Sequence, residues 1–120
     1  MSMNILIADD ERDLVAYLKE RISIKGHNVE GAYDGETTLE LIKRNKYDIV
    51  FLDHDMPGKT GLEVARYIRD NRIPTKMVMI TGYEDIEEFL ARAVGMDEYL
   101  EKPLKMADID AILKKYDKKA

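Results

Sequence analysis

Apolar, strand-like segments alternate with amphipathic, helix-like segments along the whole chain of 120 residues. The patterns predict strands at residues 4–8, 28–32, 47–53, 75–80 and 97–100, and helices at 11–25, 35–46, 60–71, 85–94 and 106–116. Thr60 and Glu63 have the capping-box spacing that begins a helix. Because the connections are short, we expect parallel pairing through right-handed crossovers. The predicted fold class is α/β, a doubly wound (βα)5 sheet of five parallel strands in the order 2-1-3-4-5.

The composition predicts a single folded domain over residues 1–120. Hydrophobic residues make up 45% of the chain, which contains only three prolines and no cysteine. The net charge of −5 argues against a nucleic-acid surface. No segment has the apolar length of a membrane span or the pattern of a signal peptide. We therefore expect a cytoplasmic protein without membrane or nucleic-acid partners.

Polar residues with useful chemistry follow four of the predicted strands. In chain order they are Asp9, Asp10, Asp53, Thr81 and Lys102. The carboxyl ends of parallel strands lie at one edge of the sheet, and open α/β sheets bind ligands there, where the strand order reverses. In the predicted order this reversal falls between the first and third strands, so we expect these side chains to share one crevice.

Such a set of side chains can hold a divalent cation and a phosphoryl group. Hard cations such as Mg²⁺ or Mn²⁺ prefer carboxylate oxygens, and an aspartate can attack phosphorus to form an acyl phosphate. Lys102 would neutralise phosphoryl oxygens, and the Thr81 hydroxyl could donate to another. Asp9 or Asp10 alone could simply cap the next helix. The complete set favours the phosphoryl site.

Four motifs surround these residues. They are Ile7-Ala8-Asp9-Asp10-Glu11, Phe51-Leu52-Asp53 followed by Met56-Pro57-Gly58 and Gly61, Ile80-Thr81-Gly82, and the segment Gly95–Pro103. With these motifs the chain resembles, over its whole length, the receiver domain of response regulators in two-component signalling, in particular chemotaxis-regulator-like receivers. The resemblance implies a flavodoxin-like fold with Asp53 as the phosphoacceptor. Asp9 and Asp10 would bind Mg²⁺ together with Asp53 and the backbone carbonyl of Asp55.

The resemblance also implies a conformational switch. Thr81 would be the switch hydroxyl, Tyr99 the aromatic switch, and Lys102 the lysine that contacts the phosphoryl group. The family likeness further implies a cis peptide bond between Lys102 and Pro103. Without the family likeness, Tyr99 would read as an ordinary half-buried strand residue.

By resemblance, the chain takes a phosphoryl group from a histidine kinase or a phosphotransfer protein in a phosphorelay. It would catalyse only its own Mg²⁺-dependent phosphorylation and dephosphorylation, and would signal to an unknown downstream protein. We expect a monomer or a weak phosphorylation-dependent dimer. No output domain is expected within these 120 residues.

The two residues that follow the phosphoacceptor, His54 and Asp55, depart from the usual pattern and leave alternatives open. His54 reads as a loop or helix-facing residue, with metal ligation a minor reading, and Asp55 adds a carboxylate that could tune the phosphoryl lifetime or be a solvated loop acid. Asp53-His54-Asp55 also matches the Asp-x-Asp of haloacid-dehalogenase-like phosphohydrolases. That family usually carries Asp-x-Asp after its first strand and has longer chains. A docking-only pseudo-receiver is the third alternative, although such a protein would lack part of the site.

Overall fold

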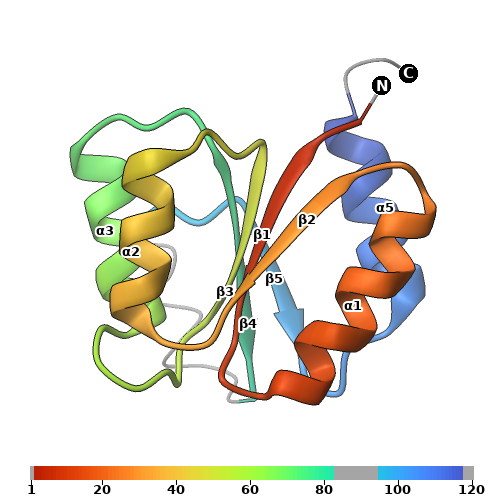
Figure 1. Cartoon of the computed structure of the whole chain (residues 1–120), viewed down its shortest axis with the longest axis horizontal. Coiled ribbons are helices and arrows are strands. Elements are labelled where there is room, and N and C mark those ends of the chain that lie inside the picture. The colour runs from red at the N-terminus through yellow and green to blue at the C-terminus, as the bar shows by residue number, and fades with distance from the viewer. Residues whose placement is uncertain (1, 83–94, 118–120) are drawn as a thin grey trace.

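The computed structural model describes residues 2–82 and 95–117, which form one parallel sheet with helices on both faces (Figure 1). The strands are β1 (Asn4–Ala8), β2 (Asn28–Ala32), β3 (Ile49–Asp53), β4 (Lys76–Thr81) and β5 (Glu98–Glu101). The helices are α1 (Arg12–Ile24), α2 (Gly35–Arg44), α3 (Gly61–Asp70) and α5 (Met106–Tyr116). The helix predicted at residues 85–94 lies outside the described residues. No helix within the described ranges is both long and apolar enough to cross a bilayer.

The strand order is β2-β1-β3-β4-β5, and every pair of neighbours is parallel. This order confirms the predicted α/β fold. β1 has β2 on one side and β3 on the other, so the connections that leave β1 and β2 run in opposite directions across the sheet. The carboxyl ends of β1 and β3 therefore flank the point at which an open sheet of this kind forms a crevice.

Side-chain alternation along the strands divides the core into two layers. Ile7 and Phe51 pack with α1 and α5, whereas Leu6 and Val50 pack with α2 and α3. Figure 1 shows these two helix pairs on opposite sides of the sheet. The strand residues named here are at most 1% exposed, and burying each such side chain contributes about 1.5–3 kcal/mol. Both faces of β1, β3 and β4 are therefore covered, and in these three strands the polar residues lie only at the strand ends.

Side-chain caps fix the starts of two helices close to the site edge. The Glu63 N–H donates to Thr60 Oγ1 at 3.2 Å, and the Thr60 N–H donates to Glu63 Oε1 at 2.9 Å. This reciprocal pair is the predicted capping box at the start of α3. At the start of α2, the Thr37 N–H donates to Asp34 Oδ1 at 2.7 Å. These bonds satisfy N–H groups that have no partner within the helix.

Strand boundaries differ from the prediction by one or two residues, each for a local reason. β3 begins at Ile49 rather than at 47, because the backbone bonds to the neighbouring strands end at Asp48, whose N–H donates to Asn4 and whose carbonyl accepts from Lys76. β4 and β5 each extend one residue further, to Thr81 and Glu101, because these two residues pair with each other. The extension makes Thr81 the last residue of β4, at the carboxyl edge of the sheet where the predicted site lies.

Candidate functional site

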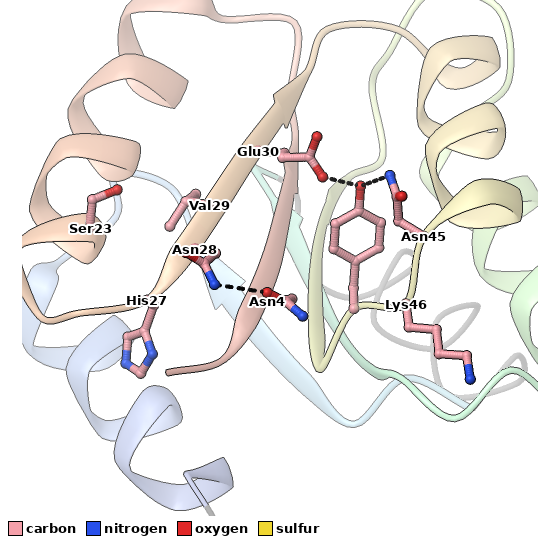
Figure 2. Close-up of a pocket in the computed structure, with 9 residues that line it drawn as sticks. Asn4, Ser23, His27, Asn28, Val29, Glu30, Asn45 and Lys46 are labelled. Carbon is pink, nitrogen blue, oxygen red and sulfur yellow. Dashed lines mark hydrogen bonds between the residues drawn. The ribbon is translucent and has the colours of Figure 1, made fainter. Parts of the chain in front are cut away.

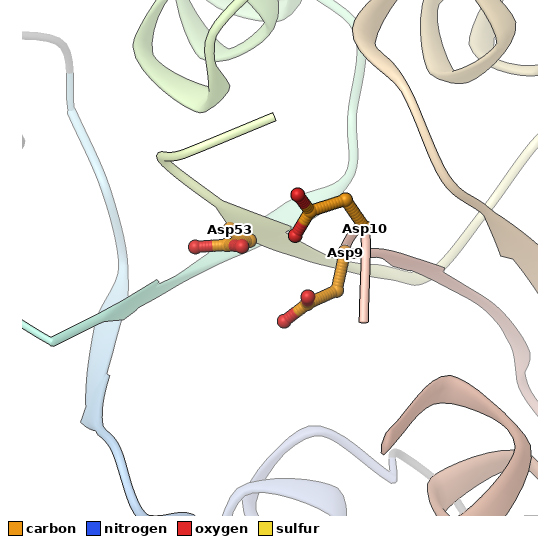
Figure 3. Close-up of side chains that lie close together, drawn as sticks. All are labelled: Asp9, Asp10 and Asp53. Carbon is orange, nitrogen blue, oxygen red and sulfur yellow. The ribbon is translucent and has the colours of Figure 1, made fainter. Parts of the chain in front are cut away.

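The strand register brings Asp9 beside Asp53. Ala8 is the pairing partner of Leu52, so the residues that follow them in the two strands are neighbours. The Asp9 N–H donates to the carbonyl oxygen of Ala32 at 3.0 Å, which continues the ladder one residue past β1. Asp10 follows Asp9 in the chain, and Figure 3 shows its side chain turned toward Asp53. The structure thus brings together the three carboxylates that the sequence placed at this edge.

The three carboxylates form a compact cluster that fits a hard divalent cation. One oxygen from each of Asp9, Asp10 and Asp53 lies within 4.8 Å of the others. Asp9 is fully buried and Asp53 is 3% exposed, whereas Asp10 is open to solvent. The Oδ2 atom of Asp9 is buried, with the Lys102 ammonium as its neighbour. Such oxygens are the ligands that Mg²⁺ and Mn²⁺ prefer.

Lys102 extends into this cluster from the end of β5. Its Nζ atom lies 3.3 Å from Asp9 Oδ2, 3.6 Å from Asp53 Oδ2 and 2.5 Å from Glu11 Oε1. Burial favours a lower pKa for Lys102, but the hydrogen bond to Glu11 and the charges of Asp53 and Asp9 outweigh it and raise the pKa above its usual range. Lys102 is therefore a permanent cation at this edge. Its peptide bond to Pro103 is cis.

The environment of Asp53 disfavours its charged form in the absence of a metal. Burial raises the pKa of Asp53 to about 7, and the charge of Asp9 adds to this effect, while Lys102 opposes it. The Asp55 N–H also stabilises the carboxylate by donating to Asp53 Oδ1 at 3.3 Å. One ammonium thus compensates only part of the negative charge, so a bound cation would lower the pKa of Asp53.

Thr81 and Tyr99 lie on the same face of the sheet. Thr81 pairs with Glu101 and Met79 pairs with Tyr99, so Tyr99 is the diagonal neighbour of Thr81 across the β4–β5 ladder. Thr81 is buried at 6% exposure, and Tyr99 is half-buried. The Lys102 N–H donates to the carbonyl oxygen of Thr81 at 2.9 Å. The backbone therefore links the predicted switch hydroxyl directly to the predicted phosphoryl-contacting lysine.

The two sheet faces carry different parts of the site. Side chains alternate between the two faces along β3, so Asp53 is on the same face as Phe51, which packs with α1 and α5. Thr81 lies one residue after Ile80, which packs in that same layer, and so Thr81 belongs to the opposite face. The predicted nucleophile and the predicted switch residue meet only at the strand ends.

The loop after Asp53 lies close to the backbone of β3. A Cβ atom on Gly61 would be 2.6 Å from the Asp53 carbonyl oxygen, so only glycine lets α3 begin this near the strand. His54 is half-buried and does not belong to the carboxylate cluster, and Asp55 is exposed. Of the two residues that follow Asp53, Asp55 is therefore the more accessible to solvent.

A hollow lies at the opposite edge of the sheet, where it is separated from the carboxylates. It has a volume of about 680 Å³ and includes the amino ends of β1 and β2 in its lining. Figure 2 shows its polar side chains bonded to one another: Asn28 donates to Asn4 at 3.1 Å, and Asn45 donates to Tyr47 at 3.2 Å. Burial and the hydrogen bond to Glu30 raise the pKa of Tyr47 to about 12. These groups satisfy each other, which is typical of a structural corner.

Glu11 lies at the carboxylate crevice, beside Lys102, and the sequence analysis gave it no functional role. It stands in the Asp9-Asp10-Glu11 motif, yet a glutamate at the start of a helix is common for reasons of charge alone. Its contact with Lys102 joins residues 91 positions apart in the sequence. The contact depends on how two long side chains meet, which the motif does not encode.

Comparison with known proteins agrees with the fold and identifies the family. The family model of the response regulator receiver domain matches residues 5–114. The chain therefore belongs to the response regulator receiver domains. The response regulator MprA of Mycobacterium sp. strain KMS is 36% identical over 110 residues, which cover 91% of this chain and 48% of the relative. The chain thus spans about half the length of the curated relatives that it matches.

Solved structures give the same result. The receiver domain of the Francisella response regulator 1452 superposes with a TM-score of 0.91 at 25% identity, over 98% of each chain. The response regulator TrrA of Thermotoga maritima, solved in complex with Mg(2+)-BeF, has a TM-score of 0.84 at 33% identity, over 97% of this chain and 99% of its own. A metal and a beryllofluoride group are thus bound by a receiver of the same fold.

Proposed function

We propose that this receiver domain accepts a phosphoryl group on Asp53 from a phosphohistidine of a histidine kinase or a phosphotransfer protein. One observation carries the proposal. Asp53 is almost completely buried at the crevice, next to the Asp9 and Asp10 carboxylates and 3.6 Å from the ammonium of Lys102. A carboxylate held among a cation and two further acids is suited to phosphoryl transfer and poorly suited to a structural role.

The transfer forms one bond and breaks one bond. An Oδ atom of ionised Asp53 attacks the phosphorus, the bond from phosphorus to the donor nitrogen breaks, and its electron pair stays on the departing imidazole, which takes up a proton from solvent. Lys102 holds a positive charge beside the incoming phosphoryl oxygens. Asp9, Asp10, Asp53 and the Asp55 carbonyl would hold Mg²⁺ or Mn²⁺, whose charge offsets that of the phosphoryl group. Hydrolysis of the acyl phosphate later restores Asp53.

Phosphorylation would then shift the population of two conformations. The new phosphoryl oxygens can accept a hydrogen bond from the Thr81 hydroxyl. The backbone carbonyl of Thr81 already accepts from the Lys102 N–H. Movement of Thr81 leaves space for Tyr99, its diagonal neighbour on the same sheet face. A changed surface near β5 and α5 is what a downstream protein would bind.

The wider assignments follow from the same proposal. These 120 residues would form a single receiver domain, alone or within a longer protein, located in the cytoplasm as a monomer or a weak phosphorylation-dependent dimer and not itself in contact with nucleic acid or membrane. Its catalysis would be limited to its own phosphorylation and dephosphorylation. Neither the comparisons nor the geometry favours the phosphohydrolase or the docking-only alternative, since all residues of the receiver motif are present.

Labelling with a small donor tests the proposal. The protein is incubated with acetyl phosphate and Mg²⁺, the adduct is reduced with borohydride, and the modified residue is located by peptide mass spectrometry. We expect one base-labile phosphoryl group, located on Asp53, and none when Mg²⁺ is chelated. An adduct on another residue, or no adduct with Mg²⁺ present, would contradict the assignment of Asp53.

Asp55→Asn is expected to change the rate of dephosphorylation by more than about threefold, roughly 0.7 kcal/mol in the barrier. Asp55 is exposed two residues after Asp53, and its backbone N–H donates to Asp53, so its charge would act on a water that attacks the phosphoryl group. The measurement is the decay of the phosphorylated protein after the donor is removed. An unchanged lifetime would make Asp55 a solvated loop acid, whereas rapid turnover of phosphomonoesters that is lost in the variant would support the phosphohydrolase.

A further inference from the structure

Lys102 contacts three carboxylates, and the shortest of these contacts is not to the phosphoacceptor. Its Nζ atom is 2.5 Å from Glu11, compared with 3.3 Å from Asp9 and 3.6 Å from Asp53. The hydrogen bond to Glu11 is also the first favourable contribution to the raised pKa of Lys102. The ammonium is therefore drawn toward the outer rim of the crevice in this state.

We propose that Glu11 is a positioning residue that holds Lys102 in the unphosphorylated protein and competes with the phosphoryl group for it. This inference rests on the proposed function of Asp53. Glu11 does not touch the reacting atoms. It fixes the position of the Lys102 ammonium in the unphosphorylated protein, and therefore how readily Lys102 can contact a phosphoryl group.

The local structure leaves the Glu11 side chain free for this role. Glu11 is the N-cap residue of α1, but its side chain makes no capping hydrogen bond. Its backbone is fixed instead, because its N–H donates to Asp9 Oδ1 at 2.9 Å. A residue anchored through its backbone to the metal-binding acid thus carries a carboxylate that points back to the lysine. Its side chain is 57% exposed, so it can release Lys102 into water without leaving a buried charge.

The charges determine which partner prevails. Before phosphorylation, Asp53 offers Lys102 at most one negative charge, at a longer distance than that of Glu11. Phosphorylation replaces this carboxylate charge with a phosphoryl group that carries nearly two negative charges and three acceptor oxygens at the same place. An ammonium has three N–H donors, so it can turn toward the new oxygens once Glu11 is outcompeted. Glu11 therefore favours the unphosphorylated state, and removing it favours the phosphorylated one.

Three variants separate the contact from its charge. Glu11→Gln removes the charge, Glu11→Asp keeps the charge but shortens the side chain by one methylene, and Glu20→Gln removes a charge from the exposed face of α1. With acetyl phosphate and Mg²⁺, we expect Glu11→Gln to be phosphorylated about threefold faster than the native protein, the range of an exposed ion pair. Glu11→Asp should show at least half of this gain, and Glu20→Gln none. A native rate in Glu11→Asp would show a through-space charge effect and overturn the positioning role.

A second measurement does not depend on phosphorylation. Reductive methylation of the unphosphorylated protein, followed by peptide mass spectrometry, reports how freely each lysine reacts. Lys102 should react about threefold faster in Glu11→Gln, while Lys115, paired with Glu98 at 2.6 Å, should be unchanged. An unchanged Lys102 would overturn the proposal even if phosphorylation proceeds normally. Faster methylation together with no phosphorylation of any variant would instead overturn the function proposed for Asp53, and the competition with it, while leaving the ion pair in place.

Discussion

Asp53→Asn is expected to stabilise the metal-free protein against unfolding by about 2–4 kcal/mol at pH 8. Burial raises the pKa of Asp53 from 3.8 to about 7, so the charged form is less stable in the folded than in the unfolded chain. Each unit of pKa difference corresponds to about 1.4 kcal/mol. The unfolded chain releases this proton first as the pH rises, so the native protein loses stability between about pH 4 and pH 7 and levels off above. An uncharged asparagine removes this penalty.

Urea unfolding in the presence of a chelator, repeated from pH 5 to pH 8, measures the effect. The native protein should lose stability over this range, whereas the Asp53→Asn profile should be nearly flat by comparison. Asp13→Asn, which removes an exposed acid from the first turn of α1, is the matched control and should follow the native profile. Added Mg²⁺ should stabilise the native protein more than Asp53→Asn. Equal stability of the native protein and Asp53→Asn at pH 8 would show that the burial of Asp53 carries no such cost.

Lys102→Met is expected to slow phosphorylation by acetyl phosphate about 100-fold, or roughly 2.7 kcal/mol in the barrier. The methionine keeps much of the length of the side chain but removes the cation that lies 3.6 Å from Asp53. Phosphoryl transfer depends mainly on positioning and on neutralising charge, so a missing cation cannot be replaced by packing. The variant should also raise the pKa of Asp53, because Lys102 at present opposes the effect of burial.

Initial rates of phosphorylation at saturating Mg²⁺ measure this loss, with circular dichroism to verify folding. Lys115→Met is the matched control, because Lys115 is also paired with a glutamate but belongs to α5, outside the crevice. It should be phosphorylated at the native rate. If folded Lys102→Met were phosphorylated within about threefold of the native rate, the charge of Lys102 would not be needed for the transfer.

The fold and most of the crevice could be predicted from sequence because both depend on periodicity. Buried parallel strands are continuous apolar runs, and their ends are marked by polar residues, so the positions of Asp9, Asp53 and Thr81 follow from the strands alone. The contact between Glu11 and Lys102 could not be predicted, because it depends on the rotamers of two long side chains far apart in sequence. Tyr47 was misplaced because an aromatic residue before an apolar run reads as strand, whereas the backbone bonds to both neighbouring strands end at Asp48.

The sheet works as a partition between chemistry and response. Asp53 follows the side-chain layer shared with α1 and α5, while Thr81 and Tyr99 lie on the other face. Because the two hydrophobic layers meet only through the backbone of the sheet, a substitution in one layer should have little effect on the packing of the other. Variation in the layer beneath α1 would then adjust how fast Asp53 gains and loses its phosphoryl group. Variation on the face of Tyr99 and on the outer surface of α5 would adjust which downstream protein binds, so donor specificity and output can diverge separately in evolution.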